Sequence, residues 1–199
     1  MDIAGQLKAV HRAVRRGETV GVLLRRTYDA HADDVWEAVT DPDRLKRWFL
    51  PISGELREGG SFALEGNAGG DILVCDPPKL LRVTFGSADS IVELRLTARD
   101  DQTVVELEHT VPLELAQNGS GALYVGPGWD GGFLGLALYL AGEATGDPVE
   151  AANSPAVQEF NLGSIDIWEA VVRDSGTATE EELAASVAVS RAQFAPDLG

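Results

Sequence analysis

The sequence predicts an α+β fold in which a curved antiparallel sheet wraps around one long helix. Two observations lead to this prediction. Between residues 60 and 112, segments with apolar side chains at every second position follow one another and are separated by short turns. This pattern is typical of an antiparallel meander with one buried face. An apolar helical segment over 129–141 follows, and at about 1.5 Å per residue it is long enough to cross such a sheet.

The elements before the meander are predicted in order as a helix, a strand and two short helices. Residues 20–28 are rich in β-branched and aliphatic side chains and predict a strand. Asp33 and Asp34 suit the first turn of a helix, and Asp41-Pro42 begins another with an N-cap and a proline at the first helical position. The opening helix is predicted over 3–16 because apolar residues recur there at helical spacing, at Ile3, Leu7, Val10 and Val14.

After the meander, the glycine-rich segment 118–128 predicts a loop before the long helix. The first turns of that helix contain three more glycines, so we expect it to begin late or in a loosened form. Its apolar stripe consists of Trp129, Phe133, Leu136 and Leu140.

The last fifty residues predict a helical hairpin. Ser154-Pro155 begins the first helix, Ser175-Gly176 ends it, and Thr179 to Glu182 has the pattern of a capping box that begins the second. We therefore divide the chain into an N-terminal helix, 1–19, a central domain, 20–147, and a C-terminal helical extension, 148–199.

Composition excludes several classes of function. The chain has 16 basic and 32 acidic residues, a net charge of −16, so nucleic acid is a poor partner. The single cysteine, Cys75, and three histidines without metal-ligand spacing predict no metal site. No phosphate loop, dinucleotide fingerprint or G-x-S-x-G motif is present, so no cofactor is expected.

The cellular location of the protein is predicted from its N-terminal residues and from its longest apolar segment. The first residues lack a basic region followed by an apolar one, and the run 133–141 is far shorter than the roughly 20 residues of a spanning helix. We expect a cytoplasmic protein that is not embedded in a membrane.

The order and spacing of several short motifs resemble the SRPBCC (START/Bet v1-like) superfamily, specifically the branch named after the activator of heat-shock-protein-90 ATPase. The resemblance covers about residues 20–143 and implies a helix-grip fold with an apolar cavity. Thr84-Phe85 departs from it, because relatives often have tryptophan after the threonine. The motifs are Arg26-Thr27-Tyr28-Asp29-Ala30, Val35-Trp36-Glu37-Ala38, Thr40-Asp41-Pro42, Lys46-Arg47-Trp48-Phe49, Gly59-Gly60-Ser61-Phe62, Asp76 to Leu81, Thr103 to Thr110, Gly128-Trp129 and Leu140-Ala141-Gly142.

The candidate site is this cavity, between the meander and the long helix. Alternation places His109 on the same face as Leu107 and Val105, where a histidine hydrogen-bonded in the core is favoured over a catalytic one. Arg95 is a candidate for the rim. No catalytic residue is assigned. The residues predicted to contact a ligand are Trp48, Phe62, Leu64, Phe85, Leu94, Leu107, His109, Trp129, Phe133 and Leu136.

Three functions remain open. The first is a carrier or sensor of a small hydrophobic molecule, since apolar walls with few polar groups are typical of such sites. The second, an enzyme like the polyketide cyclases and dehydratases of the same fold, requires a polar pair inside the cavity. The third is a co-chaperone-like module with a protein partner, or a homodimer, because the apolar faces of the 3–16 helix and of the C-terminal hairpin must be covered.

Overall fold

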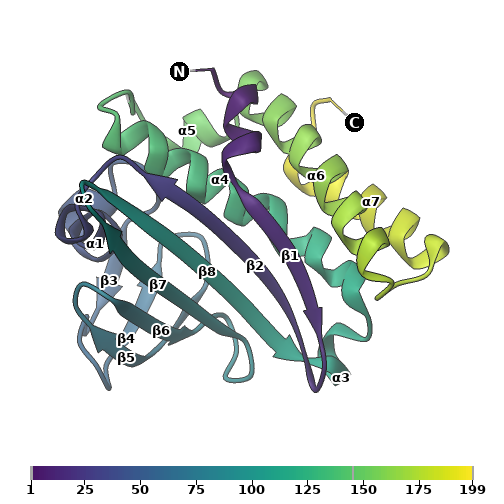
Figure 1. Cartoon of the computed structure of the whole chain (residues 1–199), viewed down its shortest axis with the longest axis horizontal. Helices are drawn as coiled ribbons and strands as arrows, with labels where there is room; N and C mark the ends of the chain where they lie inside the picture. Colours follow the sequence, from purple (N-terminus) through teal and green to yellow (C-terminus); the bar gives the residue numbers. More distant parts are fainter. Residues whose placement is uncertain (1, 145, 199) are drawn as a thin grey trace.

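The computed structural model describes residues 2–144 and 146–198, which form an eight-stranded antiparallel sheet with helices on one side (Figure 1). The strand order is β1-β2-β8-β7-β6-β5-β4-β3. The strands are β1 (His11–Arg16), β2 (Thr19–Tyr28), β3 (Ile52–Gly54), β4 (Ser61–Leu64), β5 (Gly69–Asp76), β6 (Leu80–Thr84), β7 (Ile91–Arg99) and β8 (Gln102–Pro112).

The helices form two groups in space. Two short helices, α1 and α2, close one end of the sheet. Helix α4 packs on β2 with one side and on the C-terminal helices α6 and α7 with the other (Figure 1). The helices are η1 (Ala4–Ala9), α1 (Ala32–Thr40), α2 (Pro42–Leu45), α3 (Leu113–Ala116), η2 (Gly119–Gly121), α4 (Ala122–Leu140), α5 (Pro148–Ala152), α6 (Pro155–Ser175) and α7 (Glu180–Phe194), where η marks a 3₁₀ helix. The predicted helix-grip fold is confirmed.

The predicted helix over 3–16 is wrong. A 3₁₀ helix covers Ala4–Ala9, and His11–Arg16 then forms strand β1, which pairs antiparallel with β2. The apolar spacing was ambiguous, because Val10 and Val14 also lie on one face of a strand, with Arg12 between them. Pairing with β1 covers the backbone groups that the edge of β2 would otherwise expose, and this tertiary gain decides the conformation.

The predicted late start of the long helix is also wrong. Helix α4 begins at Ala122 and includes most of the segment predicted as a loop. A Cβ atom at Gly126 would lie 2.5 Å from Cε2 of Trp168, and one at Gly135 would lie 2.9 Å from the carbonyl oxygen of Trp48. The glycines therefore allow other segments to lie against the helix backbone, and this packing offsets the cost of about 1 kcal/mol for each glycine.

The C-terminal hairpin is confirmed in its helices and caps. The Ser154 side chain accepts from the Val157 amide at the start of α6, and Thr179 and Glu182 form the capping box of α7. Helix α5 was not predicted. The apolar side of the hairpin packs within the same chain, because its large side chains are almost fully buried at Ile165, Trp168, Val172 and Leu183.

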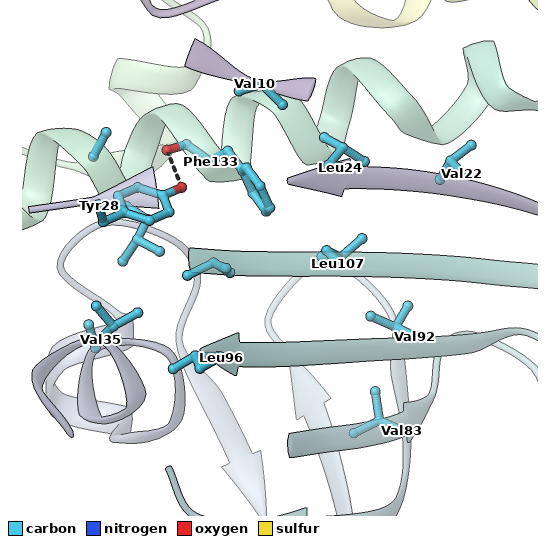
Figure 2. Close-up of a cluster of buried hydrophobic side chains, with 14 of the residues drawn as sticks. Val10, Val22, Leu24, Tyr28, Val35, Val83, Val92, Leu96, Leu107 and Phe133 are labelled. Atoms are coloured by element: carbon cyan, nitrogen blue, oxygen red, sulfur yellow. Dashed lines mark hydrogen bonds between the residues drawn. The ribbon is translucent and has the colours of Figure 1, made fainter. Parts of the chain in front are cut away.

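The main hydrophobic core lies between the sheet and α4 (Figure 2). Side chains from β2, β6, β7 and β8 point toward α4, and for β6, β7 and β8 this agrees with the predicted alternation. The Tyr28 hydroxyl donates a hydrogen bond of 3.1 Å to the carbonyl oxygen of Phe133, which links β2 to α4. Burial of this phenol raises the pKa of Tyr28 well above its usual value, so Tyr28 remains a neutral donor.

Candidate ligand-binding cavity

A cavity of about 190 Å³ lies between α4, the meander and the segment after α2. Its sheet wall is built by register: Leu81, Leu94 and Leu107 lie directly opposite one another on β6, β7 and β8 and point to the same side. Helix α4 supplies the facing wall. The residues that line the cavity are Val39, Thr40, Leu45, Trp48, Phe49, Ile52, Leu56, Phe62, Leu64, Ile72, Cys75, Leu81, Val83, Phe85, Val92, Leu94, Val105, Leu107, Trp129, Gly132, Phe133 and Leu136.

The structure brings together all of the predicted site residues except His109. The residues that the sequence reasoning missed include members of the central strands and of the two short helices. Val83, Val92 and Val105 alternate in phase with predicted neighbours on their own strands, so the same signal was available for them. Val39 and Leu45 come from the short helices, where the apolar spacing identifies a buried face but does not indicate that this face borders the cavity.

Most polar side-chain groups in the cavity wall form hydrogen bonds with other groups of the protein. The Trp48 indole donates to the carbonyl oxygen of Ala38 at 2.9 Å, and the Thr40 hydroxyl donates to that of Trp36 at 2.7 Å. The Cys75 thiol is partly exposed, and burial, followed by nearby Glu58 and Asp76, raises its pKa. At neutral pH Cys75 is a thiol, so the wall presents an apolar and uncharged surface.

His109 lies beside the cavity in a hydrogen-bonded cluster. The Trp129 indole donates to Nδ1 of His109 at 3.1 Å, so Nε2 carries the proton of the neutral imidazole and donates to the Ser90 hydroxyl at 2.8 Å. Desolvation lowers the pKa of His109 to about 4. Both ring nitrogens are occupied and the ring is neutral at pH 7, so His109 is a core histidine, as the sequence favoured.

The cavity contains no arrangement for acid–base or metal chemistry among the residues that the structure describes. Among the described residues, His109 is hydrogen-bonded to Ser90 and Trp129, neither of which ionises near neutral pH. No group of three or more histidine, cysteine, aspartate and glutamate side chains in residues 2–144 and 146–198 is placed to hold a metal ion. The prediction of Arg95 at the rim is wrong, because alternation on β7 directs it to the outer face, where it pairs with Glu93.

None of the described helices is long and apolar enough to cross a membrane.

Comparison with solved structures gives close relatives. CalU16 from Micromonospora echinospora is 37% identical in its crystal structure, with a TM-score of 0.69, covering 82% of this chain and 98% of CalU16. Its solution structure gives 40% identity and a TM-score of 0.70, covering 83% of this chain and 96% of CalU16. DynU16, described as a putative protein in the dynemicin biosynthetic locus, is 27% identical with a TM-score of 0.54, covering 67% of this chain and 49% of DynU16.

No curated protein sequence matches the chain. The family model described as "Activator of Hsp90 ATPase homolog 1-like protein" matches residues 29–141, which include β3 to β8, the two short helices and the whole of α4. The matched region therefore contains both walls of the cavity. From this match and the relation to CalU16, the chain belongs to the family of Activator of Hsp90 ATPase homolog 1-like proteins.

Proposed function

We propose that the protein binds a small hydrophobic molecule in the cavity and acts as its carrier or sensor. The observation that carries this proposal is a cavity with almost wholly apolar walls, whose tryptophan and threonine donors are already bonded to the protein. A ligand there gains the free energy of burying apolar surface, about 25 cal/mol per Å², and meets no unpaired tryptophan or threonine donor among the described residues of the wall. The cavity volume of about 190 Å³ is slightly larger than the roughly 150 Å³ that holds benzene in an engineered protein cavity.

The proposed contacts come from both walls. Leu64, Leu94 and Leu107 would cover one side of the ligand and Phe133 and Leu136 the other. Aromatic rings would close the ends, namely those of Trp48, Phe62, Phe85 and Trp129. Since His109 does not line the cavity, we remove it from the contact set and assign it the role of holding Trp129 through its hydrogen bond.

The two alternatives receive less support. A cyclase or dehydratase needs polar groups that face the cavity, and His109 is neutral, fully bonded and outside the wall. The interaction module was inferred from apolar faces that need a cover, and Ile165, Trp168 and Leu183 of the hairpin are covered within the chain.

The carrier is proposed to act in the cytoplasm. The single cysteine, Cys75, is a free thiol, and this form suits the reducing conditions of that compartment.

Mass spectrometry under native and denaturing conditions tests the proposal on protein purified from cells. We expect an extra mass that is present in the native spectrum and lost on denaturation. The native spectrum also reports whether the chain is a monomer or a homodimer. A protein without extra mass that also fails to bind ethylbenzene, a probe of about the size of the cavity, would contradict the proposal.

A pair of variants on β7 locates the site. Leu94→Trp places a larger side chain in the cavity wall and should weaken ethylbenzene binding by about tenfold or more, because it occupies the ligand's volume. Thr97→Trp adds a tryptophan on the outer face of the same strand, where Thr97 is exposed, and should leave binding unchanged. Equal binding by both variants would exclude the cavity as the site.

A further inference from the structure

A second hollow lies directly beside the cavity. It is a groove of about 600 Å³ between α4, the C-terminal extension and the segment after α2. Trp48, Phe49 and Gly132 line both the cavity and the groove. The two spaces are therefore neighbours, separated by this small group of residues.

The two aromatic side chains form a partition against α4. Their ring centroids are 5.5 Å apart, and Trp48 is held by its indole hydrogen bond to Ala38. Phe49 has no polar anchor, and a Cβ atom at Gly132 would lie 4.0 Å from its ring, so only hydrogen atoms of the helix backbone face it there. Phe49 lines both spaces and has no side-chain hydrogen bond to break, so rotation of its ring is a movement that could join them.

The cavity and the groove differ in size and polarity. The cavity, at about 190 Å³, is below the roughly 300–1,000 Å³ of typical small-molecule sites, whereas cavity and groove together fall within that range. The groove has apolar walls at Leu138 and Val149, and polar side chains at its margins, including Arg47, Asn67 and Gln193. A molecule that occupied both spaces would have an apolar end in the cavity and a polar end in the groove.

We propose that the cavity and the groove are two halves of one site for an elongated amphipathic molecule, which passes between Phe49 and Gly132. This inference rests on the proposed function and names its ligand class. It also assigns a role to the C-terminal extension, since α5, the start of α6 and the end of α7 build the outer wall of the groove. The extension lies beyond residues 29–141, so the groove is an addition to the part of the fold that the family model matches.

Two probes with the same apolar end test the proposal. Ethylbenzene fits the cavity alone, whereas 8-phenyloctanoate carries a chain and a carboxylate long enough to reach the groove. The variant is Gly131→Leu: Gly131 lines the groove but not the cavity, and a Cβ atom there would meet nothing within 4 Å, so the added side chain starts from open space at the groove. Gly131→Ala is the matched control, because it makes the same backbone change with a small side chain.

We expect 8-phenyloctanoate to bind the unmodified protein more tightly than ethylbenzene in calorimetric titration. Gly131→Leu should weaken the binding of 8-phenyloctanoate by about tenfold, because it displaces about two buried methylenes of the ligand. The affinity for ethylbenzene should not change. Gly131→Ala should change neither affinity by more than about twofold.

The outcomes separate this inference from the proposed function. If both probes bind and Gly131→Leu affects neither, the joined site is overturned and binding in the cavity stands. If Gly131→Leu weakens the binding of 8-phenyloctanoate but Leu94→Trp does not, the ligand lies in the groove alone, and the joined site is again overturned. If neither probe binds, the joined site is overturned, and if the purified protein also carries no extra mass, the proposed function is overturned with it.

Discussion

Arg12 and Asp130 form an ion pair of 2.8 Å inside the protein, with side chains that are 3% and 0% exposed. The pair joins β1 to α4. Ser164 and Trp168 of α6 donate to the same carboxylate at 2.6 and 2.9 Å, so one buried charge holds the N-terminal strand, the long helix and the C-terminal hairpin together. The carboxylate accepts hydrogen bonds from three side chains, which offsets the cost of removing it from water.

Loss of one member of this pair should destabilise the protein strongly. We expect Arg12→Gln to lower the free energy of unfolding by about 3–5 kcal/mol, because it leaves the Asp130 carboxylate buried without its cation. Arg15→Gln on the same strand is the control: Arg15 pairs with Glu108 at 3.3 Å with its side chain 62% exposed, and its loss should cost less than about 1 kcal/mol. Urea unfolding of both variants measures the difference, and equal stability would contradict this role.

His109 should make stability depend on pH between about 6.5 and 4. Desolvation lowers its pKa in the folded protein to about 4, below the 6.5 of the unfolded chain, so the unfolded chain binds more protons in this range. Stability contributed by neutral His109 is complete above pH 6.5 and is lost as the pH falls through this range, by about 3 kcal/mol in total.

His109→Gln supplies the comparison, because glutamine does not titrate and the carboxylates are the same in both proteins. Between pH 7 and pH 4, the free energy of unfolding should fall by about 3 kcal/mol less in the variant than in the unmodified protein, as measured by denaturant unfolding. The same loss in both proteins would mean that His109 has the same pKa in the folded and unfolded states, and therefore that burial does not lower it.

Two glycines on α4 should respond oppositely to alanine. Gly126→Ala should destabilise by about 1–3 kcal/mol, because its Cβ atom would lie 2.5 Å from the fully buried Trp168 ring and force the two helices apart. Gly131→Ala meets open space and should stabilise by up to about 1 kcal/mol through helix propensity alone. Thermal or urea unfolding of the pair measures both signs. Stabilisation by Gly126→Ala would show that α4 and α6 are not in close contact.

Cys75 should report occupancy of the cavity. It lines the cavity and is the only cysteine in the chain, so a maleimide reagent labels one known position. Its raised pKa keeps the less reactive thiol form at pH 7, and we expect labelling to accelerate with pH above the usual thiol pKa of about 8.5. Ethylbenzene at saturating concentration should slow labelling, measured by intact mass, whereas labelling after denaturation should be unaffected. A rate that does not change with ethylbenzene would place the probe elsewhere.

Short-range patterns in the sequence predicted much of this structure. Alternation along β6, β7 and β8 correctly placed Phe85, Leu94 and Leu107 on the face toward α4, because a strand has only two faces and one must be apolar. Local capping chemistry placed the starts of α2, α6 and α7, because those hydrogen bonds join residues two or three positions apart.

The errors arose where a distant partner decides the local conformation. Residues 11–16 have an apolar spacing that suits a helix or a strand, and the free edge of β2 selects the strand. Residues 122–128 have low helix propensity, yet they are helical in α4, where Trp168 of α6 packs against Gly126. The same limit applies to the site, where alternation alone could not separate His109, which bonds to Trp129 and Ser90, from the residues of the cavity wall.

The sequence by itself therefore determined the fold class, the family resemblance, the meander and most of the apolar wall of the cavity, because these depend on periodicity and contacts between near neighbours. Only the tertiary structure decided that Arg12 pairs with Asp130, that Trp168 packs against Gly126, and that the C-terminal extension forms a groove beside the cavity. Each of these joins segments tens of residues apart. Their free energies come from burial and close packing of complementary surfaces, which no short window of sequence contains.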